Sequence, residues 1–220
     1  MAFSLINHTY TYGADNLATS AVNTTGANLI VIAIAKSMGA ALTVRDSKGN
    51  TWTLIASADE YYLTVALYYC VNPTVGPGHI FYGDGTSIYA DIFVQAWSGA
   101  NSSPLDVETT NVTAGTSSSL ATGSVLPSVD NELVVAALAT GSGPYFTYSI
   151  DSGFSISDQN DAVLNVSYGG GLASLVQTTK GAVNPTWSWG SNTHSAVAIA
   201  SFKPGASAPA LPFMFQPFAI

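Results

Sequence analysis

Short runs of β-branched and aromatic residues alternate with clusters of Gly, Asn, Asp, Ser and Pro along most of the chain, a pattern typical of β-strands joined by turns. Within residues 61–69 successive side chains fit the two opposite faces of a strand. No segment keeps a 3.6-residue period between helix caps, so no long helix is expected. The pattern predicts strands at residues 28–35, 51–55, 61–69, 79–82, 88–97, 132–139, 145–150, 162–168, 172–178, 186–189 and 196–202.

The first and second halves of the chain match each other in an ordered series of segments. The sequence LATSAVNTTGANLIVIAIA from Leu17 matches LATGSVLPSVDNELVVAALA from Leu120. Later matches pair IFYG with WSWG, and then VQAW with IASF. Because the order is kept and the spacing drifts only slightly, the matches indicate an internal repeat with halves at about residues 16–100 and 119–203.

These patterns predict an all-β fold. We expect a jelly-roll-like β-sandwich of residues 1–204, built from the two sequence-related halves with pseudo-two-fold symmetry. One half alone supplies about six strands, too few to bury both faces of its sheets, and two small sandwiches in tandem are the alternative arrangement. The join at residues 98–119 is rich in Ser, Thr, Asn and Gly, so it is either a linker or, at residues 105–107, a strand.

The character of the chain changes after Pro204. Residues 205–209 have the composition of a flexible spacer, and residues 211–220 carry no charge, three aromatic side chains and two prolines. An exposed apolar tail is an aggregation hazard, so we expect it to dock on a neighbouring subunit, with its own sandwich as the alternative. The residues expected to make this assembly contact are Leu211, Phe213, Met214, Phe215, Phe218 and Ile220.

The composition determines the chemistry of the surface. Charged residues make up 8% of the chain and the net charge is −8, so the polar surface must consist mainly of Ser, Thr, Asn and Gly. The five basic residues are scattered, which argues against binding of nucleic acid or of an anionic membrane. Such surfaces are typical of secreted and virion proteins. The first residues lack the features of a signal peptide, which favours a phage virion over a secreted domain.

Few residues offer catalytic chemistry. Cys70 is the single cysteine and ends an apolar strand, so we expect a small buried thiol rather than a nucleophile. The histidines His8, His79 and His194 have no metal-binding spacing, and His79 is expected in a turn or at the surface. No GxSxG motif occurs, and the three glutamates lie in no catalytic frame, so we expect solvated carboxylates and no enzyme, metal or cofactor. These glutamates are Glu60, Glu108 and Glu132.

Four aromatic residues are candidates for ligand binding. Trp187 and Trp189 are two residues apart on a predicted strand and share one face, where they either stack on a sugar or belong to the core. Their counterparts in the first half are also large and apolar or aromatic, which favours the core. Tyr145 and Tyr148 follow a Gly-Pro pair and are expected to be partly exposed.

Several segments resemble an uncharacterised β-rich domain of bacterial surface proteins and phage-encoded proteins. They are DSKGNTW from Asp46, LYYCVNPTVGPGH from Leu67, SGANSSPLD from Ser98, DNELVVA from Asp130 and NPTWSWG from Asn184. The resemblance covers residues 14–203 and implies an extracellular or virion setting, without an established activity or functional residues to transfer.

The sequence thus predicts a structural protein of a phage virion, first a capsid decoration or accessory protein and next a tail or fibre component. Its partners would be copies of itself, with a trimer as the expected but not sequence-determined number, and other virion proteins. The alternative is a secreted or cell-surface carbohydrate-binding module that uses Tyr145, Tyr148 or the Trp187/Trp189 pair to bind a surface glycan.

Overall fold

The structure is a computed structural model that describes residues 2–37, 42–85, 89–141, 147–161 and 168–206. Within these ranges the chain forms strands β1 to β16 and no helix, so the predicted all-β fold is confirmed. Accordingly, no helix in the described ranges has the length and apolar character needed to cross a membrane.

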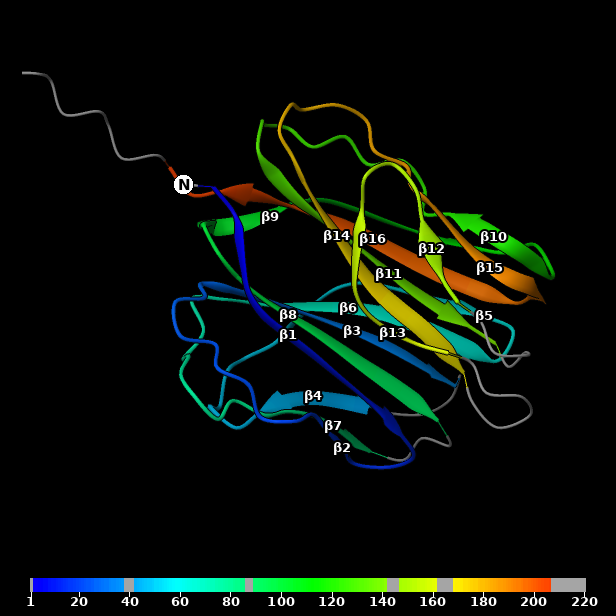
Figure 1. Ribbon diagram of the computed structural model, residues 1–220, viewed down its shortest axis with the longest axis horizontal. Coiled ribbons are helices and arrows are strands. Elements are labelled where there is room, and N and C mark those ends of the chain that lie inside the picture. Colours follow the sequence, from blue (N-terminus) through cyan, green and yellow to red (C-terminus); the bar gives the residue numbers. More distant parts are fainter. Residues whose placement is uncertain (1, 38–41, 86–88, 142–146, 162–167, 207–220) are drawn as a thin grey trace, which may run out of the picture.

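Each half of the chain forms its own pair of antiparallel sheets (Figure 1). In the first half, the five-stranded sheet has the order β1 (Ser4–Gly13), β8 (Ala90–Ser98), β3 (Leu29–Ser37), β6 (Leu63–Val71), β5 (Thr53–Glu60), and the three-stranded sheet has the order β2 (Leu17–Ala18), β7 (Phe81–Gly85), β4 (Leu42–Asp46). In the second half, the corresponding orders are β9 (Ala100–Val112), β16 (Ser195–Pro204), β11 (Glu132–Thr140), β14 (Gly169–Gln177), β13 (Ser155–Asn160), and β10 (Ser117–Ala121), β15 (Thr186–Thr193), β12 (Ser149–Ile150).

The two halves therefore share one strand order, position by position. Even an isolated bridge between Val22 and His79 has a counterpart between Val125 and Val183. This agreement is what the repeat in the sequence leads one to expect, and it extends to β1 and β9, which lie outside the matched segments. The origin of the halves by duplication and the jelly-roll character stay predictions.

The sheets stack in four layers, because the two five-stranded sheets face each other and each three-stranded sheet covers one outer face (Figure 1). The central core joins Leu29 and Phe93 of the first half to Leu133 and Phe202 of the second. Strands β3 and β11 lie between two layers, which explains why their sequences are continuous apolar runs rather than alternating ones. Each half is thus a sandwich, as in the tandem alternative, yet both share one core, as in the single sandwich.

The contact between the halves is reciprocal. Strand β5 packs against β9 and β16, while its counterpart β13 packs against β1 and β8, the counterparts of β9 and β16. Such reciprocity is the property of a contact related by a two-fold axis. Hydrogen bonds cross the same contact, for example from Gln95 Nε2 to Ser157 Oγ at 2.9 Å.

Most predicted strands are present with ends shifted by a few residues, but the sequence pattern missed β1, β2, β4, β10 and β13. The predicted strand at residues 162–168 lies almost entirely outside the described residues. The join at residues 98–119 is not a linker, because β9 occupies most of it and forms an edge of the second five-stranded sheet. Its polar composition reflects exposure along an edge rather than flexibility.

Candidate functional site

The predicted ligand-binding aromatics do not form an exposed platform. Trp187 is fully buried and Trp189 is 6% exposed, so both belong to the outer core of the second half. Tyr148 is also buried, with its hydroxyl 2.7 Å from Thr140 Oγ1. A ring covered by protein cannot stack on a sugar, so the structure assigns these three residues to packing. Tyr145 lies outside the described residues.

The predicted assembly residues also lie outside the described residues, which end at Ala206. The structure does describe the place from which that segment departs. The backbone N–H of Gly205 donates to Gly99 O at 2.6 Å, and Gly99 in turn packs against the backbone of Ala2 and Phe3. The last described residues therefore lie beside the start of β1, as Figure 1 shows.

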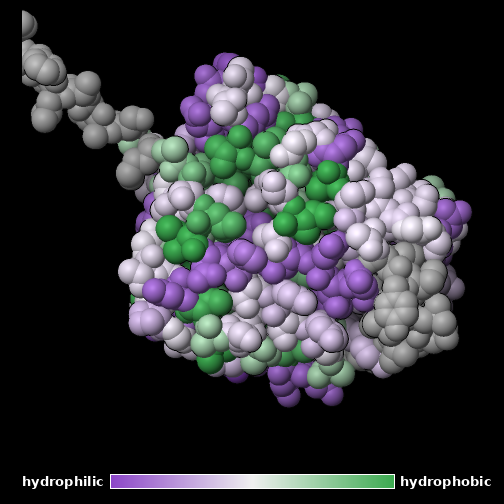
Figure 2. All heavy atoms as spheres, viewed as in Figure 1, coloured by the Kyte–Doolittle hydropathy of each residue, from purple (hydrophilic) through white to green (hydrophobic). Residues whose placement is uncertain are grey.

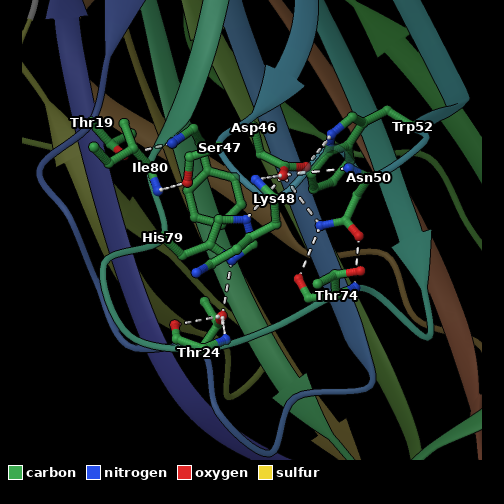
Figure 3. Close-up of polar contacts among 12 residues, drawn as sticks. Thr19, Thr24, Asp46, Ser47, Lys48, Asn50, Trp52, Thr74, His79 and Ile80 are labelled. Atoms are coloured by element: carbon green, nitrogen blue, oxygen red, sulfur yellow. Dashed lines mark hydrogen bonds and ion pairs between the residues drawn. The ribbon is translucent and has the colours of Figure 1, made fainter.

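A buried polar network joins three segments of the first half around His79 (Figure 3). His79 is fully buried, its Nδ1 lies 2.9 Å from Thr24 Oγ1, and its Nε2 lies 3.2 Å from Asp46 Oδ1. The imidazole also stacks on Phe81, with ring centroids 4.3 Å apart. The expectation of a turn or surface histidine is thus wrong, because its two polar partners come from distant parts of the chain and allow its burial.

Asp46 is the anionic centre of this network. Its Oδ1 accepts a hydrogen bond from the Lys48 backbone N–H at 2.7 Å, and its Oδ2 accepts one from Trp52 Nε1 at 2.9 Å. Burial opposes ionisation, but the hydrogen bonds from His79 and from the Lys48 and Asn50 amides lower the pKa of Asp46 from 3.8 to about 2. The carboxylate stays ionised at neutral pH and organises the turn after β4.

The order aspartate, histidine, hydroxyl resembles a catalytic triad, but this network lacks access. Thr24 and His79 are 0% exposed, so no substrate can reach the Thr24 hydroxyl. In the second half Val183 takes the place of His79, and Asp151 accepts a hydrogen bond from the Thr186 backbone instead. The network therefore acts as a structural clasp of the first half.

A pair of carboxyl groups lies where β9, β16 and β11 meet. Asp106 contacts Lys203 Nζ at 2.7 Å, and Glu132 accepts a hydrogen bond from the Val129 backbone at 2.9 Å. Burial and the neighbouring Asp106 raise the pKa of Glu132. Glu132 is fully buried, so the expectation that it is solvated is wrong, whereas Glu108 is exposed as expected.

Cys70 is buried as expected. Burial and the nearby Asp46 raise the pKa of its thiol to about 11, which keeps it protonated and a poor nucleophile. Among the described residues, no cluster of three or more His, Cys, Asp or Glu side chains is arranged to hold a metal ion.

A pocket rich in tyrosine lies between the two halves, where the β5–β6 turn meets the β15–β16 turn. Its volume is about 130 Å³, and it is lined by Tyr61, Tyr62, Leu63, Gly141, Tyr168, Thr193 and His194. Tyr61 and Tyr62 are 58% and 57% exposed, although both rings are large and apolar. The sequence pattern predicts a strand that begins at Tyr61, whereas Tyr61 and Tyr62 form a turn and β6 begins at Leu63.

The tyrosine side chains of this pocket are held by contacts to the opposite half. The Tyr61 ring stacks on His194, with centroids 4.4 Å apart and planes at 16°, and it meets Tyr62 edge-on at 3.9 Å. His194 Nδ1 lies 3.0 Å from Glu60 Oε1, which fixes the imidazole. Tyr61 also has a φ of 53°, a left-handed conformation that costs a bulky residue on the order of 1–3 kcal/mol.

A second exposed feature is the free edge of β1. This strand is ten residues long and pairs only with β8 among the described strands. It carries four of the nine exposed large hydrophobic side chains of the described residues, namely Leu5, Ile6, Tyr10 and Tyr12. Figure 2 shows apolar side chains over the first part of β1, close to the N-terminus.

The other edges of the five-stranded sheets carry more charge and proline than β1 does. Strand β5 carries Asp59 and Glu60, β13 carries Asp158, and β9 carries Pro104 together with acidic residues. Charges and prolines of this kind prevent an edge from pairing with another chain. Strand β1 contains no Asp, Glu, Lys, Arg or Pro, and its protection is limited to a bulge between Leu5 and Asn7 and to His8, which pairs with Asp158 of β13.

No protein-family model, curated protein or solved structure matches this chain.

Proposed function

We propose that this protein is a non-catalytic structural subunit that assembles with copies of itself, as a capsid decoration or accessory protein of a phage virion. The observation that carries the proposal is the apolar edge of β1 beside the point where the chain leads into its apolar tail. The virion setting rests on the surface chemistry, in which uncharged polar residues replace most charges. The buried clasp and the unreactive Cys70 supply no accessible nucleophile.

The apolar side chains of the tail of one subunit pack against β1 of a neighbour. Residues 207–220 follow directly on the described chain, and they contain the apolar residues Phe213, Phe215, Phe218 and Ile220. Burial of a large apolar side chain contributes about 1.5–3 kcal/mol, and three prolines in this segment reduce the entropy lost on docking. The exposed side chains of β1 offer the matching apolar surface.

Geometry favours a neighbour over the same subunit. The tail departs beside the start of β1, so within one subunit it would have to run parallel to that strand. Within one subunit the tail has only this direction open to it, whereas between subunits either direction is open. When subunits exchange tails, the contact between each tail and β1 is enough to join them, and no other contact surface is needed.

Light scattering on the purified protein tests the proposal. We expect the full chain to be oligomeric, and a chain that ends at Ala206 to be a folded monomer. Ile6→Lys on β1 should also give a monomer, whereas Leu126→Lys, at an exposed position outside β1, should leave the oligomer intact. A monomeric full chain, or a truncated chain that is unfolded, would refute the proposal.

The virion setting has a separate test. Mass spectrometry of purified particles from the source phage should detect the protein at a fixed ratio to the capsid or tail proteins. Its absence from particles, with export to the medium or the cell surface, would support the alternative of a secreted module.

A further inference from the structure

We propose that the tyrosine pocket between the halves is a saccharide-binding site. The inference is independent of self-assembly, and it places ligand binding at Tyr61, Tyr62, Tyr168 and His194 rather than at the buried tryptophans. Small-molecule sites are concave, mostly aromatic or apolar, and carry a few fixed polar groups. This pocket has that composition, and both halves of the chain contribute to it.

The aromatic side chains suit the apolar face of a sugar ring. A pyranose presents C–H groups on its faces and hydroxyl groups around its rim, so it pairs with an exposed aromatic face bordered by polar atoms. Tyrosine offers both a ring and a hydroxyl at its tip. Tyr61 and Tyr62 remain more than half exposed, because the turn between β5 and β6 holds them above the sandwich surface.

The polar groups around the pocket suit neutral hydroxyl groups. Thr193 and His194 line the pocket, and Glu60 holds the His194 ring through Nδ1. These groups can donate to and accept from sugar hydroxyls. No Lys or Arg is among the lining residues, so the pocket offers no cation for a sulfated or acidic sugar.

The backbone at Tyr61 supports a binding role. A turn position with positive φ is ordinarily filled by Gly, Asn or Asp, and an aromatic residue there is strained. Strained residues that persist in a fold cluster at functional sites, because the surrounding contacts hold them in place. Here the stack on His194 supplies that contact.

The ring arrangement disfavours a quaternary ammonium ligand. A cage for such a cation needs several aromatic faces turned towards one point. One face of Tyr61 is covered by His194, and Tyr61 meets Tyr62 edge-on. The rings therefore do not surround one point with their faces, as an aromatic cage does.

The test uses the full chain in two assays. A glycan array surveys saccharides broadly, and saturation-transfer NMR measures glucose, galactose, mannose, N-acetylglucosamine and tetramethylammonium directly. We expect at least one neutral saccharide to bind with a dissociation constant of about 1 mM or tighter. Tyr62→Ala should weaken that binding at least ~10-fold.

Two variants separate binding from folding. Tyr61→Gly relieves the positive φ, so it should keep or raise the melting temperature while it abolishes binding. Tyr12→Ala removes an equally exposed tyrosine from β1 and should leave binding unchanged. The proposal is overturned if no saccharide binds in either assay, if tetramethylammonium alone binds, or if Tyr61→Gly and Tyr62→Ala bind like the wild-type protein. A chain ending at Ala206 should bind normally, which distinguishes this site from assembly.

Discussion

Asn160 donates a hydrogen bond from Nδ2 to Asp91 Oδ1 at 2.7 Å, and this bond connects β13 of the second half to β8 of the first. Asp91 is 1% exposed, and its Oδ2 has no hydrogen-bond partner among the described residues. Burial raises the pKa of Asp91 well above its ordinary value, and the bond from Asn160 offsets this only in part. The contact between the halves therefore contains a carboxyl group that favours the neutral form.

Replacing Asp91 tests that assignment through pH. Because the folded-state pKa is raised, the folded protein binds a proton that the unfolded chain releases, so Asp91 lowers stability as pH rises above about 4. Asp91→Asn should match the wild-type protein near pH 3 and exceed it at neutral pH by ~1 kcal/mol or more. Urea denaturation across this range measures the difference. Glu108→Gln, at an exposed site, should show no such trend, and parallel curves for Asp91→Asn would contradict the assignment.

Among the residues of the buried clasp, His79 is the one whose substitution should lower stability most. His79→Ala removes one of the partners of the buried Asp46 carboxylate, the stack on Phe81 and a fully buried side chain, so we expect a loss of ~2–5 kcal/mol in unfolding free energy. His8→Ala is the matched control, because His8 pairs with Asp158 but its side chain is 44% exposed. That change should cost at most ~1 kcal/mol. Equal losses in the two variants would show that the buried network is not a clasp.

Gly170 lies where the second half packs closely against β3 of the first half. A Cβ at this position would lie 2.4 Å from Leu138 O and 3.0 Å from Ala35 Cβ of the other half. Gly170→Ala should therefore destabilise the protein by ~1–3 kcal/mol. Gly190→Ala, where a Cβ would meet nothing within 4 Å, should change stability by less than ~0.5 kcal/mol. Thermal unfolding of both variants checks the packing of the central core.

The parts of the fold that the sequence predicted are those buried on both faces. Strands β3 and β11 are continuous apolar runs bounded by turn residues. Such runs indicate a buried strand without knowledge of the neighbouring elements. Strands β1 and β9 were missed or read as a linker because edge strands are partly solvated and polar. Their pairing is set by the neighbouring strand rather than by their own pattern.

The candidate sites were harder to predict because they depend on partners far apart in sequence. His79 is buried only because Thr24 and Asp46 reach it from other segments. The tyrosine pocket exists only because the turn at Tyr61 meets His194 of the other half. The closely spaced pair Trp187 and Trp189 gave a clear local signal, yet its meaning depended on the core around it.

The central claim is that the tail of one subunit packs against β1 of another. Cysteine cross-linking between two populations tests it directly, because Cys70 is buried with a raised pKa and stays unreactive. One population carries Ile6→Cys, Tyr10→Cys or Tyr12→Cys, and the other, isotope-labelled, carries Phe215→Cys. After mixing and oxidation, we expect mass spectrometry to find disulfides that join labelled to unlabelled chains. A further variant carries Ile6→Cys and Phe215→Cys in one chain. Disulfides that form within this chain, with none between the two populations, would contradict the account.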